Sequence, residues 1–98
     1  MTRLDQYLKY TGLFKQRSEA KRACLEGRIR IGEISAKASR EVQIGELLTI
    51  DTPSRHIEAE VLEIPRRSVA KGKRTEFYRI IVEREQNEVE EMLSFDDF

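Results

Sequence analysis

The chain has 98 residues, which is enough for one compact domain and too few for two independently folding units with a linker. Hydrophobic residues make up 39% and charged residues 37%, so a small core must carry a strongly ionic surface. The single cysteine excludes an internal disulfide, the first residues do not resemble a signal peptide, and no apolar run approaches the roughly 20 residues that span a bilayer. We therefore expect a cytoplasmic protein with no membrane partner.

The 18 basic and 18 acidic side chains cancel in total but are unevenly distributed. Residues 1–40 contain 10 Lys and Arg against 4 Asp and Glu, residues 41–79 contain 7 against 7, and residues 80–98 contain 1 against 7. Phosphate binding needs clustered cations rather than a high total, so the basic first segment is typical of a nucleic-acid-binding surface. A solvated ionic face without a ligand is the alternative interpretation.

The first third of the chain has the periodicity of two short helices. Thr2 and Asp5 resemble a capping box and precede apolar residues at i, i+3, i+4 spacing, which predicts a helix from Arg3 to about Tyr10. Ser18 is a good N-cap for a second helix, and Gly27 is well placed to end it in a left-handed conformation. Small residues on one face of that helix would allow close packing: Ala20, Ala23 and Cys24.

The rest of the chain alternates between β-prone runs and turn residues. Strict polar-apolar alternation over Arg28–Ile31 predicts a strand, and Gly32-Glu33 predicts a tight reversal after it. We then expect strands at 47–50 and 56–64, a basic loop at 66–74, a strand at 77–82 and an acidic tail at 85–98. A helix is the alternative for 77–82, and the tail allows either a docked helix or a mobile end. Two helices followed by a small, largely antiparallel sheet indicate an α+β fold.

Side chains suited to catalysis are scarce. The chain has one histidine, His56, and one cysteine, Cys24, and it contains no glycine-rich phosphate loop, GxSxG elbow or HExxH pattern. Cys24 falls on the small-residue face of the second helix, which favours a buried apolar role over a nucleophile. Metal-ligand spacing is also absent from the sequence. We therefore expect no enzymatic activity, no metal site and no cofactor.

Cationic side chains gather near the start of the second predicted helix. Arg17 and Lys21 are one turn apart, as are Ser18 and Arg22, and a helix N-terminus favours phosphate through its free N–H groups. Arg22 has acidic residues at i−3 and i+4 that can pair with it, so it is the weakest candidate. Six cations have no equally convenient acidic neighbour in the sequence: Arg17, Lys21, Arg28, Arg30, Lys37 and Arg40.

Five ordered blocks resemble the S4-type RNA-binding domain, first recognised in the ribosomal small-subunit protein of that name. The blocks are RLDQYL at 3–8, FKQRSEAK at 14–21, GRIRI at 27–31, AKAS at 36–39 and VQIGEL at 42–47. The resemblance implies two helices packed on a small bent sheet, with RNA bound by the helix pair and the adjoining sheet edge. The residues that it implies for RNA contact are Arg3, Lys15, Arg17, Ser18, Lys21, Arg22, Lys37, Ser39 and Arg40. We expect Arg28 and Arg30 to supply supporting charge.

Two positions depart from the family pattern. The usual Asn-Gly turn is Gly32-Glu33 here, which places a negative charge beside the expected RNA face, and the usual Lys-Pro-Ser is Lys37-Ala38-Ser39. Neither change removes a principal cation. We divide the chain into an S4 domain at 1–64, best matched over 3–50, a basic loop and extra strand at 65–84, and the tail at 85–98.

Among S4 proteins, the chain is similar to the fifteen-kilodalton heat-shock protein family, which binds the large ribosomal subunit stalled with a nascent chain on tRNA. It is also similar to small S4 proteins of ribosome-associated quality control. The resemblance implies a non-catalytic binder of rRNA or tRNA, with the large ribosomal subunit as its partner. We expect the chain to be a monomer. Three alternatives stay open: a protein-interaction module that uses the acidic tail, a tail that covers the basic face, and an accessory subunit of an RNA-modifying enzyme.

Overall fold

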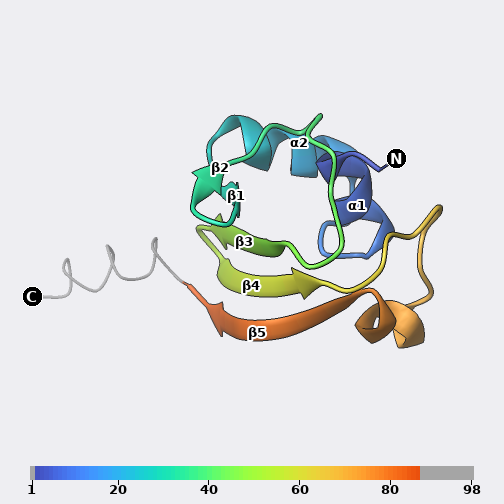
Figure 1. Cartoon of the computed structure of the whole chain (residues 1–98). Coiled ribbons are helices and arrows are strands. Elements are labelled where there is room, and N and C mark those ends of the chain that lie inside the picture. The colour runs from blue at the N-terminus through green and yellow to red at the C-terminus, as the bar shows by residue number, and fades with distance from the viewer. Residues whose placement is uncertain (1, 87–98) are drawn as a thin grey trace, which may run out of the picture.

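The structure is a computed structural model that describes residues 2–86. Within these residues, two α-helices, one 3-10 helix and five strands follow one another along the chain (Figure 1). The helices are α1 (Leu4–Tyr10), α2 (Arg17–Leu25) and η1 (Lys71–Glu76), and the strands are β1 (Ile29–Ile31), β2 (Ile34–Ser35), β3 (Leu47–Thr52), β4 (Arg55–Val61) and β5 (Tyr78–Glu85). The predicted α+β fold, with two short helices on an antiparallel sheet, is confirmed.

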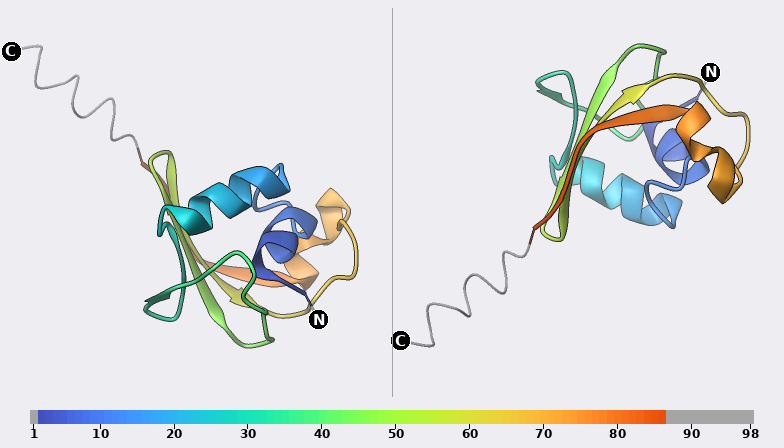
Figure 2. Two further views of the ribbon diagram at one scale, coloured as in Figure 1. Left: turned by 90° about the horizontal axis from the view of Figure 1, so that it is seen from above. Right: turned by 90° about the horizontal axis from the view of Figure 1, so that it is seen from below.

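The described strands form one antiparallel sheet in the order β2-β1-β3-β4-β5. The two α-helices lie together on one side of this sheet (Figure 2). Alternation along the strands decides which side chains enter the core between them. In β4, Ile57, Ala59 and Val61 are buried, whereas Glu58 and Glu60 between them are only half-buried. The outward-facing side chains of β4 are therefore polar, and its apolar side chains face the helices.

The first helix begins at Leu4 because Gln6 Oε1 accepts a hydrogen bond from the backbone N–H of Arg3 at 3.2 Å. The capping pair predicted at Thr2 and Asp5 is therefore wrong by one residue. Asp5 is fully buried and accepts hydrogen bonds from the backbone N–H of Gln6 and from Arg17 Nε, so its carboxylate is not available to cap the helix. Three fully buried side chains anchor α1 in the core: Leu4, Tyr7 and Leu8.

The second helix begins at Arg17 with Gln16 as its cap, so both its cap and its first residue lie two positions before those predicted with Ser18 as the cap. It ends at Leu25, and Gly27 follows with a φ of +75°, which confirms the predicted left-handed ending. The small residues predicted to allow close packing are buried: Ala20, Ala23 and Cys24. These side chains are small, so α2 can pack closely against the rest of the core.

The segment that follows β4 runs back to α1 before it enters β5. The backbone N–H of Val69 donates to the carbonyl of Tyr10 at 2.8 Å, and the hydroxyl of Tyr7 donates to the carbonyl of Phe77 at 2.9 Å. The strand predicted over 77–82 is β5, so the helical alternative is wrong. Residues 87–98 of the predicted acidic tail lie outside the described residues, and the proposed domain limits stay predictions.

Candidate nucleic-acid interface

A groove of about 640 Å³ lies between α2 and the loop formed by residues 36–40. Its lining residues are Arg3, Lys21, Arg22, Cys24, Leu25, Lys37, Ala38 and Ser39. They include four cations and no carboxylate, so the groove is suited to a negatively charged ligand. We call it the α2 groove. Five of the residues predicted to contact RNA line it.

The loop over residues 36–40 is held against the start of α1 by backbone hydrogen bonds. The N–H groups of Leu4 and Asp5 donate to the carbonyls of Arg40 and Ala38, at 2.7 and 3.1 Å respectively. These are two of the N–H groups that a helix leaves without a partner in its first turn. The loop is thereby fixed beside α2, and Lys37 is presented to the groove.

Helix α2 turns its polar face to the groove because its small residues are packed into the core. Lys21 and Leu25 lie one turn apart on the groove side, while Ala20 and Ala23 are buried. Leu25 is 88% exposed, which leaves an uncovered apolar surface next to the cations. A ligand in the α2 groove therefore meets both charge and apolar surface.

A buried carboxylate orients two of the predicted arginines. Asp5 is fully buried, and its Oδ2 accepts a hydrogen bond from Arg17 Nε at 3.0 Å. Its Oδ1 lies 3.4 Å from Arg3 Nε and accepts a hydrogen bond from the backbone N–H of Gln6 at 2.9 Å. Both arginine side chains remain more than 40% exposed (45% for Arg3 and 42% for Arg17), so their outer N–H groups are available to a ligand. This role of Asp5 is not among the sequence-based predictions, although the residue stands in the RLDQYL block.

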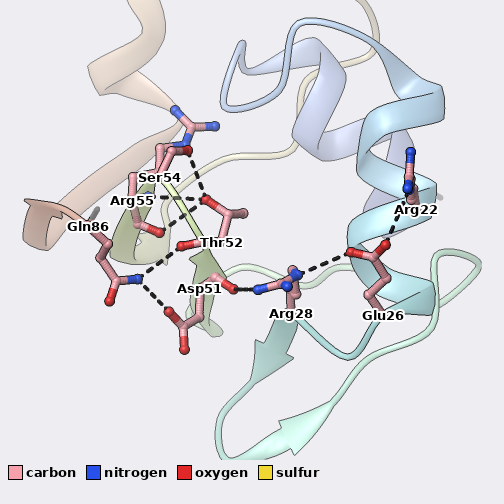
Figure 3. Close-up of polar contacts among 8 residues, drawn as sticks. All are labelled: Arg22, Glu26, Arg28, Asp51, Thr52, Ser54, Arg55 and Gln86. Atoms are coloured by element: carbon pink, nitrogen blue, oxygen red, sulfur yellow. Dashed lines mark hydrogen bonds and ion pairs between the residues drawn. The ribbon is translucent and has the colours of Figure 1, made fainter. Parts of the chain in front are cut away.

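The end of α2 carries a chain of ion pairs on its outer surface (Figure 3). Arg22 Nε lies 3.2 Å from Glu26 Oε2, which confirms one of the two pairings predicted for Arg22. Arg28 Nε lies 3.1 Å from Glu26 Oε1, and its Nη1 donates to the carbonyl of Asp51 at 3.5 Å. Hydrogen bonds from Arg28 and then Arg22 hold the pKa of the Glu26 carboxyl below its usual value. An exposed pair of this kind contributes little to stability, so Arg22 can exchange Glu26 for a phosphate at small cost.

Three cations that were predicted to lack acidic neighbours are ion-paired in the structure. Arg17 pairs with Asp5, Arg28 pairs with Glu26, and Arg40 Nη2 lies 2.8 Å from Glu46 Oε2. The prediction failed because it considered neighbours along one helix, whereas these partners lie before the helix, beyond its end or across a loop.

Arg30 lies apart from the other candidates. Its neighbours in β1, Ile29 and Ile31, are buried against the helices, so Arg30 points to the opposite face of the sheet. There it lines a separate hollow of about 420 Å³ together with Thr49 and Glu58. The structure therefore does not bring Arg30 together with the helix-pair cations.

Beside Arg30, five predicted residues do not line the α2 groove: the ion-paired Arg17, Arg28 and Arg40, and also Ser18 and Lys15. Ser18 is not the cap of α2, and its hydroxyl lies 3.4 Å from Gln16 Oε1. Lys15 stands in the connection between α1 and α2, where it lines a hollow at the far end of α1 with Lys9 and Arg74. The single predicted RNA face thus divides into two separate cationic regions.

The titratable groups considered for catalysis do not form a site. Cys24 is on the helix side of the sheet, while His56 is on the outer face, with its Nε2 at 3.0 Å from Glu58 Oε2 and its Nδ1 at 3.5 Å from Asp51 Oδ1. Among residues 2–86, no three His, Cys, Asp or Glu side chains gather as a metal site. Over the same residues, no helix has the length and apolar character needed to cross a membrane.

Burial of Cys24, reinforced by the negative charge of Asp5, raises the pKa of its thiol to about 11. We expect slow alkylation by iodoacetamide near pH 8 in the native protein, and fast alkylation in urea. The unfolded thiol loses its proton first, near its ordinary pKa of about 8.5, so this group should lower stability only as the pH rises from there toward 11. Urea denaturation at about pH 7.5 and 10.5 measures the decline. Cys24→Ala should decline less over this range, and an equal decline would contradict the assignment.

The S4 domain family matches residues 2–48, which include both α-helices, β1, β2 and the residues that line the α2 groove. The chain is therefore a small S4-domain protein. Over 86 residues the chain is 34% identical to the RQC P-site tRNA stabilizing factor of Listeria monocytogenes, covering 88% of this chain and 92% of that protein. It is also 34% identical to the factor of the same name from Bacillus subtilis, covering 88% of this chain and 99% of that protein. The chain belongs to the family of these RQC P-site tRNA stabilizing factors. The resemblance to small S4 proteins of ribosome quality control is confirmed.

A solved structure supports the same fold. The trimeric structure of heat shock protein 15 from Vibrio cholerae superposes with a TM-score of 0.77 at 23% identity, covering 83% of this chain and 82% of that one. The relatives at 34% identity are named as factors that stabilize P-site tRNA, which agrees with the expectation that the chain is not an enzyme.

Proposed function

We propose that the chain is a non-catalytic RNA-binding protein that holds structured rRNA or tRNA on the large ribosomal subunit during ribosome quality control. The observation that carries this proposal is the α2 groove, in which four cations and no carboxylate come together in a chain of zero net charge. Membership of a family named for stabilizing P-site tRNA points to the same ligand. The groove is complete within one chain, so we propose a monomer that acts in the cytoplasm, where ribosomes work.

The groove would bind the RNA backbone. Lys21 lines it from α2 and Lys37 lines it from the loop, so together they can hold the phosphates of one strand. Arg3 and Arg17, which both pair with the Asp5 carboxylate, would add two phosphate contacts. Such contacts recognise the shape of a folded RNA more than its sequence.

The test is the salt dependence of binding to purified large ribosomal subunits and to bulk tRNA, measured by filter binding. Neutralising about six phosphates should lower the affinity about 10³-fold between roughly 50 and 200 mM KCl, because each contact releases condensed counterions. Binding that does not change over this range would refute the proposal, since no phosphate contact would then contribute.

A further inference from the structure

The described part of the chain ends at Gln86, which is fastened to the end of β3 and the turn after it. Its side-chain Nε2 donates to Asp51 Oδ1 at 2.7 Å and to the carbonyl of Thr52 at 3.0 Å. Its backbone N–H donates to the carbonyl of Ser54 at 2.9 Å. These hydrogen bonds fix the point at which the next residues, 87–98, begin.

Side-chain contacts connect this point with the α2 groove (Figure 3). The carbonyl of Asp51 accepts a hydrogen bond from Arg28 Nη1 at 3.5 Å, and Arg28 Nε lies 3.1 Å from Glu26 Oε1. Glu26 Oε2 in turn lies 3.2 Å from Nε of Arg22, which lines the groove. Residues 87–98 reach about 40 Å when extended, whereas α2 is only about 14 Å long. The segment is therefore long enough to pass the end of α2 and follow the groove.

The composition of residues 87–98 is complementary to that of the α2 groove. The segment contains five carboxylates and no Lys or Arg, whereas the groove lining contains four cations and no carboxylate. The segment is also rich in apolar side chains, and the groove presents Leu25, which is 88% exposed. It thus matches both the charge and the apolar surface of the groove. Its acidic residues are Glu88, Glu90, Glu91, Asp96 and Asp97, and its apolar residues are Val89, Met92, Leu93, Phe95 and Phe98.

Covalent attachment makes even a weak contact with the groove effective. A segment attached so near competes at an effective concentration on the order of 1 mM. A groove that bound the separate segment with a dissociation constant of only about 0.1 mM would then be filled in roughly nine-tenths of the free chains. RNA would find an open groove in the remaining tenth, so its apparent affinity would be about 10-fold lower.

We propose that residues 87–98 occupy the α2 groove in the free chain and must leave it before RNA binds. The segment is then a competitor built into the protein. It suppresses weak contacts with isolated anions, whereas an RNA that offers several phosphates at once displaces it. This inference rests on the proposed function, because it takes RNA as the ligand that displaces the segment.

Carbodiimide crosslinking of the full chain tests the contact in the absence of RNA. The reagent joins a carboxylate to an amine only where the two groups touch, and mass spectrometry of the peptides identifies the pair. We expect the carboxylates of residues 87–98 to couple to Lys21 and Lys37 at least about fivefold more than to Lys71 and Lys73, which are exposed outside the groove. Added tRNA should suppress the coupling to Lys21 and Lys37.

Two crosslinking results would overturn the inference. One is equal coupling to lysines inside and outside the groove, because the segment would then have no preferred position. The other is coupling between chains, which a mixture of ¹⁵N-labelled and unlabelled protein reveals, because the segment would then fill the groove of a second copy.

The competition itself is measured as an affinity for tRNA. In the full chain, Glu88→Gln/Glu90→Gln/Glu91→Gln should bind tRNA about 10-fold more tightly than the wild type near 0.1 M salt, because the groove is then open in most chains. Filter binding at limiting tRNA measures the change. An affinity equal to that of the wild type would overturn the inference.

A charge-matched control separates competition from general repulsion between carboxylates and RNA. Glu33→Gln/Glu63→Gln/Glu83→Gln also removes three exposed carboxylates, none of which lines the α2 groove or forms an ion pair within residues 2–86. Its affinity for tRNA should stay within about twofold of the wild type. An equal gain in both triple variants would overturn the inference, since net charge alone would explain it.

A third variant changes no charge. Met92→Ser/Leu93→Ser/Phe95→Ser keeps every carboxylate but removes apolar side chains that would contact Leu25 in the groove. It should bind tRNA about threefold more tightly than the wild type, because the segment holds the groove less firmly. An unchanged affinity would overturn the assignment of Leu25 to this contact.

The inference and the proposed function fail in different ways. Equal affinity for tRNA in the wild type and in the variant with three neutralised glutamates of the segment would overturn the inference and leave the proposed function standing. Failure of every chain to bind tRNA or ribosomal subunits would refute the proposed function, while the crosslinks would still decide whether the segment fills the groove.

Discussion

Replacing Lys21 and Lys37 together with alanine is expected to weaken binding to the large ribosomal subunit and to tRNA by roughly 50- to 100-fold near 0.1 M salt. Each ammonium group lies in the α2 groove, and neither forms an ion pair within residues 2–86, so both are available to phosphate. The slope of log affinity against log salt should fall by about 2, one for each lost contact. Filter binding over a salt series measures both quantities.

The double variant should unfold at the same urea concentration as the wild type, since both side chains are exposed. Arg79→Ala/Arg84→Ala is the matched control, because it removes two cations from β5, away from the α2 groove. Its affinity and salt slope should stay close to those of the wild type. An unchanged salt slope in Lys21→Ala/Lys37→Ala would remove the α2 groove from the RNA interface.

Asp5→Ala should weaken RNA binding about 5- to 10-fold, although it deletes a negative charge beside the site. Charge alone predicts the opposite sign, because removing a carboxylate near phosphate lowers repulsion. The loss is expected because the Asp5 carboxylate holds Arg3 Nε at 3.4 Å and Arg17 Nε at 3.0 Å. Without Asp5, both side chains lose conformational freedom only when RNA binds, and this entropy cost lowers the affinity. Asp5 is therefore a positioning residue. Filter binding with tRNA measures the change.

The same variant should lower the free energy of unfolding by about 2 kcal/mol. Breaking a buried ion pair costs about 3 to 5 kcal/mol, but the arginines of this cluster are partly exposed and regain water, which reduces the loss. Glu41→Ala is the matched control, because Glu41 is an exposed carboxylate paired by a backbone bridge with Arg3. It should bind RNA as tightly as the wild type or slightly more tightly. If Asp5→Ala also bound more tightly, the positioning role would be refuted.

Proximity along the chain predicted the local structure well. The left-handed turn at Gly27 depends on the residue itself, and the pairing of Arg22 with Glu26 depends on i, i+4 spacing within one helix. The strand predicted from the alternation over Arg28–Ile31 is β1, and its apolar members Ile29 and Ile31 are buried. The same alternation turns Arg30, between them, to the opposite face, so its charge does not support the helix-pair cations.

Composition and motif order thus determined the class of this protein: one α+β domain of the S4 type, without catalytic or metal-binding patterns, and with a basic first segment. Only the tertiary structure decided which cations act together. Asp5 of α1 pairs with Arg17 of α2, and the loop carrying Lys37 is held to α1 by backbone hydrogen bonds. Arg74 lines the same hollow as Lys15 because a distant segment folds back against α1. The physical reason is that secondary structure depends on neighbouring residues, whereas a binding surface depends on which residues the chain brings close in space.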